Sequence, residues 1–190
     1  MKDNYISDQK FENIHFIETP LQIGTYENCN FHTCDFAAAP LDHFVFIDCT
    51  FIGCNLSNAS IVQTSFRDTT FTDCKMMGLH FDYCKDFLFS VSFQRCILNH
   101  SFFYKLKLKK TPFLECKLHD VDFSEADLTE ANFNNSDLAG AIFDQSNLEK
   151  ANFIDAFSYT INPASNKIKK AQFSTSGLGG LLTQYNIKIV

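Results

Sequence analysis

The sequence predicts an all-β solenoid, in which short strands wind around one apolar core in four-sided coils. Three observations support this fold class: a large apolar residue recurs at every fifth position, the 190 residues include 22 Phe but no Trp, and there are only 7 Gly and 4 Pro. A period of five excludes a regular helix, because steps of five advance about 140° around the axis and bury no single face. It also excludes a flat strand, because an odd period sends successive large residues to opposite faces.

The five-residue period starts at Phe11 and continues to Phe81. The next step falls on Asp86, and a shift of two residues restores the period from Leu88 to Phe153. Of the 29 large positions, which we number i, 16 hold Phe and 10 hold Leu, while 23 of the positions i−2 hold a small residue. We therefore predict one repeat domain over residues 1–156, with a two-residue register shift between residues 82 and 88.

Positions i and i−2 point the same way in extended backbone, so both are expected to face the core, with a corner at i+2 and its neighbour. Four sides of five residues make one coil of 20 residues, and coils stack at roughly 4.8 Å by backbone hydrogen bonding. The repeats give about seven coils on this spacing. Residues 20 apart form columns, of which two are Phe93, Phe113, Phe133, Phe153 and Leu88, Leu108, Leu128, Leu148.

The C-terminal segment, residues 157–190, leaves the simple repeat and is predicted to form a short helical cap. The end of a solenoid exposes strand edges and apolar side chains, which must be covered. One apolar helix face followed by an alternating strand would cover them, and we expect this segment to bury the last coil and to join two chains. The expected dimer interface consists of Leu178, Leu181, Leu182, Tyr185, Ile187 and Ile189.

The charge is unevenly distributed along the chain, whose net charge is −6. Residues 118–156 carry nine acidic side chains and one basic side chain, whereas residues 67–117 carry nine basic and five acidic ones. The acidic block is either a solvated surface that keeps the rod soluble or a field that imitates the phosphates of DNA. Its candidate partner-binding residues, all at outward or corner positions, are Asp120, Asp122, Glu125, Asp127, Glu130, Asp137, Asp144 and Glu149.

A basic run, Lys105, Lys107, Lys109 and Lys110, interrupts any uniform imitation of DNA in the middle of the rod. Its alternation with leucines is the inward and outward alternation of the repeat, so a solvated face is expected there. The net negative charge argues against direct binding of nucleic acid.

The eight Cys invite a zinc site, because Cys29, Cys34, Cys49 and Cys54 are paired at short spacing. Packing is the stronger interpretation, because seven Cys occupy the small position i−2, where a thiol acts as a small apolar group. The six His do not cluster, and no catalytic triad, phosphate loop or paired-carboxylate motif occurs. We therefore expect a protein without enzymatic activity, cofactor or metal.

The absence of a signal peptide and of an apolar run of ~20 residues, together with cysteines expected to be reduced, predicts a cytoplasmic protein that does not enter the membrane.

The stretch ADLTEANFNNSDLAGAIFDQSNLEKANF at residues 126–153 resembles the pentapeptide-repeat family, and the likeness extends over residues 9–153. This resemblance implies a right-handed quadrilateral β-helix. The tail, with INPASNKI and GLGGLLTQYNIKI, and the stretch FFYKLKLKKTPFLECKL at residues 102–118 resemble the microcin-immunity and quinolone-resistance (Qnr-type) branch.

In that branch, the resemblance implies a cytoplasmic dimer joined through its C-terminal ends. The acidic rod would imitate duplex DNA, bind DNA gyrase or another type II topoisomerase, and protect it from inhibitors such as quinolones or peptide toxins. Members with strong quinolone protection carry protruding loops, whereas this chain has only the two-residue insertion. The alternatives are an interaction scaffold for a different protein and an immunity protein for a peptide that targets gyrase.

Overall fold

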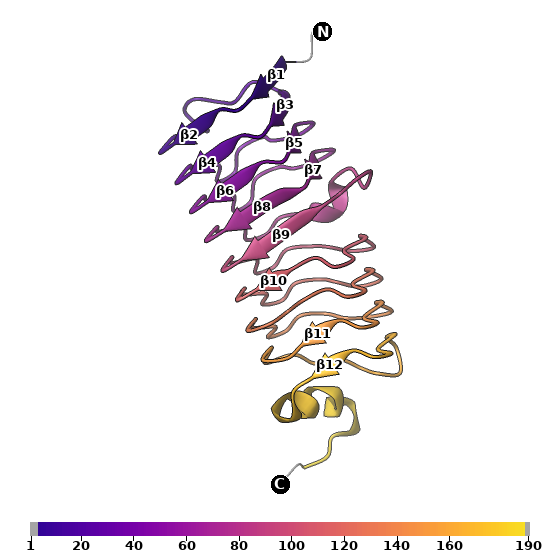
Figure 1. The fold of residues 1–190 in the computed structure, drawn as a ribbon. Coiled ribbons are helices and arrows are strands. Elements are labelled where there is room, and N and C mark those ends of the chain that lie inside the picture. The colour runs from indigo at the N-terminus through magenta and orange to yellow at the C-terminus, as the bar shows by residue number, and fades with distance from the viewer. Residues whose placement is uncertain (1–3, 189–190) are drawn as a thin grey trace.

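The computed structural model describes residues 4–188 as a solenoid of about eight coils, which confirms the predicted fold class (Figure 1). It has one coil more than the repeats predict, because pairing begins at Asn4 and extends to Phe173. Its strands are β1 (Asn4–Ser7), β2 (Lys10–Glu12), β3 (Gly24–Glu27), β4 (Asn30–His32), β5 (Val45–Ile47), β6 (Thr50–Ile52), β7 (Ser65–Arg67), β8 (Thr69–Thr72), β9 (Val91–Gln94), β10 (Phe113–Leu114), β11 (Asn152–Phe153) and β12 (Gln172–Phe173). Three 3₁₀ helices, η1 (Phe81–Tyr83), η2 (Thr175–Leu181) and η3 (Thr183–Tyr185), complete the described elements.

All the strand pairs are parallel and join residues one coil apart. Phe11 pairs with Phe31 and Phe31 with Phe51, a step of 20 residues, whereas Phe71 pairs with Phe93, a step of 22. We name the four sides of the rod by their inward residues: face A contains Phe31 and Phe133, face B Phe36 and Leu138, face C Leu41 and Phe143, and face D Phe46 and Leu148.

The core is a set of stacked aromatic columns. Phe133 is fully buried, and its ring stacks on Phe113 at 5.1 Å and on Phe153 at 4.9 Å between centroids. It also meets Phe123 edge to face at 5.7 Å. Offset stacking and edge-to-face contact are the favourable arrangements of aromatic pairs. The small residues at i−2 leave room for these rings, so the sequence pattern and the packing agree.

The corners lie at position i+2, as the repeat predicts, and the backbone there is left-handed. Asp48 has φ +51°, Lys110 has φ +61° and Gly140 has φ +70°. Asn, Asp and Gly adopt this conformation most easily, but Lys and Glu also occupy it here. At Gly140 a Cβ atom would also collide with the carboxylate of Asp120 one coil away.

The register shift corrects one sequence prediction. Leu88 was expected to face the core, but it is 61% exposed and has φ +57°, and Phe89 packs against Phe81 instead. The physical reason is that the pairing of β8 with β9 fixes Phe93, so the extra residues leave the wall. They form an outward bulge, residues 85–90, just before β9 (Figure 1).

The C-terminal segment begins with a further turn of solenoid, since Asn152 pairs with Gln172. Its helices are 3₁₀ rather than α, and Gly180 lets η2 approach Tyr159 so closely that a Cβ atom would collide with it. Leu181 packs against the core, while Leu178, Tyr185 and Ile187 are exposed. Ile189 lies outside the described residues, and the role of this segment in joining two chains remains a prediction. Across residues 4–188, none of the helices has the length and apolarity that a membrane crossing requires.

Candidate protein-binding surface

The acidic block lies on the outside of the C-terminal half of the rod. Asp122 and Asp144 are on face C, Asp127 and Glu149 are on face D, and Asp137 is on face B. The other three occupy left-handed corners, namely Asp120, Glu125 and Glu130. The block therefore wraps around three sides of the rod and leaves face A free of acidic side chains in these coils, apart from its corners.

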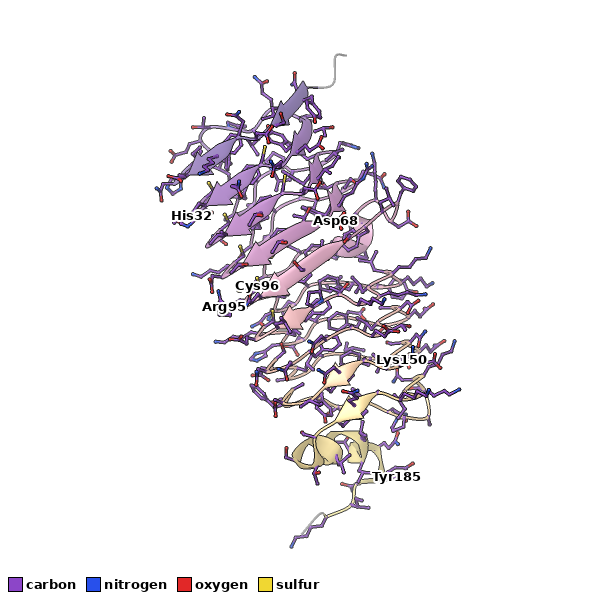
Figure 2. The ribbon with its side chains drawn as sticks, in the orientation of Figure 1. His32, Asp68, Arg95, Cys96, Lys150 and Tyr185 are labelled. Atoms are coloured by element: carbon purple, nitrogen blue, oxygen red, sulfur yellow. The ribbon has the colours of Figure 1, made fainter. Side chains whose placement is uncertain are left out.

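Lysines one coil away compensate part of this negative charge. The Nζ atom of Lys105 lies 3.3 Å from a carboxylate oxygen of Glu125, and that of Lys109 lies 3.3 Å from Asp127. Glu130 receives two lysines, Lys110 from the preceding coil at 3.8 Å and Lys150 from the following coil at 3.0 Å. Figure 2 shows Lys150 near the C-terminal end of the solenoid and Tyr185 beyond the last strand.

Two further carboxylates lie beside histidines in the same way. His100 is 3.6 Å from Asp120, and Nε2 of His119 is 2.7 Å from Asp137. Burial raises the pKa of Asp137, but hydrogen bonds, led by the one with His119, outweigh it and leave the pKa below its ordinary value. At Glu130, the hydrogen bond from Lys150 is the main cause of a lowered pKa. The lowered pKa values keep Asp137 and Glu130 ionised at neutral pH.

Asp122, Asp144 and Glu149 differ from the other predicted residues, because within residues 4–188 no basic side chain forms an ion pair with them. In the described part of the chain, Asp122 accepts a hydrogen bond only from the N–H of Ser124, at 2.8 Å. Among the eight predicted residues, the uncompensated charge thus lies on faces C and D, in the last coils before the C-terminal segment. Whether any of the eight predicted residues binds a partner remains a prediction.

The middle of the rod carries an exposed aromatic cluster that the sequence reasoning missed. His80 stacks between Tyr83, at 4.7 Å, and Phe102, at 4.2 Å between ring centroids. Phe87, in the bulge, is 67% exposed, and the Arg67 guanidinium lies 5.7 Å from its ring centre. The signal in the sequence was an aromatic residue at outward positions of the repeat, where polar residues are the rule.

The cysteines are buried, and all eight are free thiols. Five of them form a column on the inner side of face B, at its buried i−2 positions: Cys34, Cys54, Cys74, Cys96 and Cys116. The Cys49 thiol donates to the carbonyl oxygen of Tyr26 at 3.3 Å, and burial raises its pKa to about 12. No group of side chains suited to a metal ion occurs among residues 4–188. The inward packing accounts for these residues as small apolar groups.

Comparisons with known proteins agree with this architecture. A family model described as "Pentapeptide repeat region" matches residues 19–103 and 80–153. Two trypsin-treated variants of QnrB1, a plasmid-mediated fluoroquinolone resistance protein, have a similar structure. One variant gives a TM-score of 0.58 at 15% identity, and the other gives 0.59 at 16%. Each alignment covers 99% of this chain and 98% of the other. Among curated protein sequences, none matches.

Proposed function

The chain belongs to the pentapeptide-repeat family, and we propose that it is a non-enzymatic, cytoplasmic dimer that binds DNA gyrase or another type II topoisomerase. In this proposal it protects the enzyme from inhibitors such as quinolones or peptide toxins. Two solved structures that it resembles in fold are those of a fluoroquinolone resistance protein, which motivates the choice of partner.

The observation that carries the proposal is the group of uncompensated carboxylates, Asp122, Asp144 and Glu149. Asp122 and Asp144 lie on face C in successive coils, which stack at roughly 4.8 Å, of the same order as the phosphate spacing along a DNA strand. Glu149 lies on the adjoining face D of the same coil as Asp144. A protein surface that grips DNA through basic side chains would find comparable negative charge here. Dimerisation through the C-terminal segment would place a second copy of this surface beside the first.

The ion pairs refine the imitation of DNA that the sequence suggested. Glu125, Asp127 and Glu130 already have lysine partners at the surface of the same molecule. Exposed pairs of this kind are worth only ~0–1 kcal/mol, but they still reduce the field that a partner meets. We therefore assign the main contribution to the three uncompensated residues.

Two triple variants test this assignment, because each removes three negative charges from outward positions. Asp122→Asn/Asp144→Asn/Glu149→Gln should weaken gyrase binding by at least tenfold and reduce its salt dependence. Glu125→Gln/Asp127→Asn/Glu130→Gln is the matched control and should have a smaller effect. Binding is measured between about 50 and 300 mM salt, where exposed charges become progressively screened. Equal binding by the parent and the first variant would contradict the imitation of DNA.

Gyrase supercoiling assays separate the possible inhibitors. Purified protein should restore supercoiling in the presence of a fluoroquinolone, of a gyrase-directed peptide toxin, or of both. The second candidate function is an interaction scaffold for another protein, which the aromatic cluster around His80 favours. Absence of gyrase binding even at low salt would support the scaffold.

A further inference from the structure

The bulge breaks the backbone ladder on face D. In regular coils of this face, three hydrogen bonds link each segment to the one before it. For the segment that contains Asp127, they join Asp127 N–H to Leu106, Leu108 N–H to Asp127, and Lys110 N–H to Thr129, at 2.8 to 2.9 Å. The segments that contain Asn147 and Lys167 repeat the same three bonds.

The segment of Lys107 lacks all three of these bonds to the bulge. Within residues 4–188, neither the N–H nor the carbonyl of Lys107 bonds to backbone in the preceding coil, nor does the carbonyl of Lys109. Ser90 N–H, which would have reached Lys109, bonds to the carbonyl of Phe66 instead, at 3.0 Å. The ladder is therefore open at this position.

A cleft of about 360 Å³ occupies this opening. The wall formed by the coil that follows the bulge carries the three lysines Lys107, Lys109 and Lys110. Phe89 and Pro112 provide apolar surface, Asp68 is the acidic residue of the lining, and Thr70, Ser90 and Ser92 bring hydroxyl groups. Thr69 and Thr111 also line the cleft but are buried, and the Thr69 hydroxyl donates to the carbonyl oxygen of Phe46. The volume lies within the range of small-ligand sites, near its lower end.

We propose that this cleft binds a small phosphorylated molecule. Ammonium groups and hydroxyl groups are the donors that phosphate oxygens accept from, and lysine binds phosphate as a point charge. Lys107 forms no ion pair among residues 4–188, so its charge is available. The Thr70 hydroxyl accepts from Ser92 at 3.1 Å and keeps its own proton for a ligand.

The charges that face the cleft are compatible with an anion. The Asp68 carboxylate accepts a hydrogen bond from the Ser90 hydroxyl at 2.8 Å, and its single negative charge is outnumbered by the three lysines of the lining. Lys109 and Lys110 contact Asp127 and Glu130, but both lysines are more than half exposed, so these pairs are weak and rearrange at little cost.

The ligand is small because the charge bands on both sides exclude a long polyanion. Residues 1–66 carry eight acidic and two basic side chains, and residues 118–156 carry nine acidic and one basic. A nucleic acid that reached the lysines would therefore be repelled before and after them along the rod. A short phosphate compound fits within the basic band alone.

The rod supplies a matched control for the test. Lys167, Lys169 and Lys170 occupy the same three positions on face D as the cleft lysines, but the ladder above them is intact. Inorganic pyrophosphate is the probe, titrated into the full chain at low ionic strength and followed by calorimetry and amide NMR. We expect saturable binding, with shifts in residues 85–92 and 107–111.

The variant Lys107→Gln/Lys109→Gln/Lys110→Gln should weaken pyrophosphate binding at least tenfold, whereas Lys167→Gln/Lys169→Gln/Lys170→Gln should leave it unchanged. Equal losses of pyrophosphate affinity in the two variants would mean that lysines attract the anion anywhere on the rod, and this would overturn the proposal. So would the absence of saturable binding up to about 10 mM, beyond the millimolar limit of weak specific sites.

A deletion variant tests the contribution of the cleft separately from that of its lysines. Removing Asp86 and Phe87 restores the five-residue spacing with Leu88 inward, so the ladder should close while the three lysines remain. Loss of pyrophosphate binding is expected in a deletion variant that keeps the circular dichroism of the parent. Retained binding would show that the lysines act without the cleft and would overturn the proposal. If the deletion prevents folding, the two lysine variants still decide.

Discussion

The variant Phe133→Ala tests the packing that holds the coils together. Phe133 is fully buried between the stacked rings of Phe113 and Phe153. Removing a buried aromatic side chain loses about 1.5–3 kcal/mol of transfer free energy. A residual cavity on the order of 80 Å³ adds about 2 kcal/mol at ~24 cal/mol per Å³. The expected loss in free energy of unfolding is therefore about 3–5 kcal/mol.

The assay is urea unfolding followed by circular dichroism, with Phe157→Ala as the control. Phe157 loses the same atoms, but its side chain is 51% exposed on face B, so its variant should cost less than about 1 kcal/mol. Because each coil contacts only its neighbours, the destabilised region should also exchange its amide protons faster than the N-terminal coils. A loss below about 1 kcal/mol for Phe133→Ala, or an equal loss for both variants, would refute the axial position of this ring.

Three further predictions concern the thiols, an ion pair and the cap. All eight thiols are buried, and burial raises the pKa of Cys49 to about 12. Because the reagent cannot reach a buried thiol, a disulfide reagent at pH 8 should label the eight thiols only in denaturant; rapid labelling of the native protein contradicts this. Arg95 contacts Asp73 at 2.7 and 2.8 Å and lowers its pKa. The pair therefore stabilises the fold above the unfolded pKa of Asp73, and this is lost as pH falls through the folded pKa. Carboxyl NMR of Arg95→Gln should show the Asp73 pKa returning to its ordinary value, and an unchanged pKa disproves the pairing. Light scattering at micromolar concentration should give a dimer, and deletion of residues 174–190 a monomer or aggregate; a 21.7 kDa parent monomer excludes the dimer.

The wall of the rod was predictable because its rule is local. The position of a residue within its own five-residue unit determines whether its side chain faces inward, so Phe31 or Phe133 could be placed without knowledge of the rest of the chain. The rule failed at Leu88, because the two extra residues allow the five-residue period to restart in more than one register. Asp86 was the available signal, because a shift that makes Leu88 inward also places this carboxylate at i−2, facing the core, where an unpaired charge is costly.

The charge pattern was only half predictable for a different reason. Counting along the chain gave an acidic block, but neighbours on the rod are 18 to 22 residues apart in sequence. Lys105 and Glu125, or Lys150 and Glu130, become visible as pairs only when the sequence is read in columns. The open ladder above Lys107 could not be predicted at all, because it depends on the path that the bulge takes.

The backbone bonds between coils run along the rod, and this orientation determines how the protein responds to pulling. A force applied to the two ends would load the bonds of a terminal coil one after another instead of shearing a whole sheet at once. Each coil that peels away releases 20 residues, or roughly 70 Å of extended chain at about 3.5 Å per residue. The rod should therefore unfold at low force in a series of similar small steps, one coil at a time. The coil at the bulge has fewer of these hydrogen bonds, so it should detach at the lowest force.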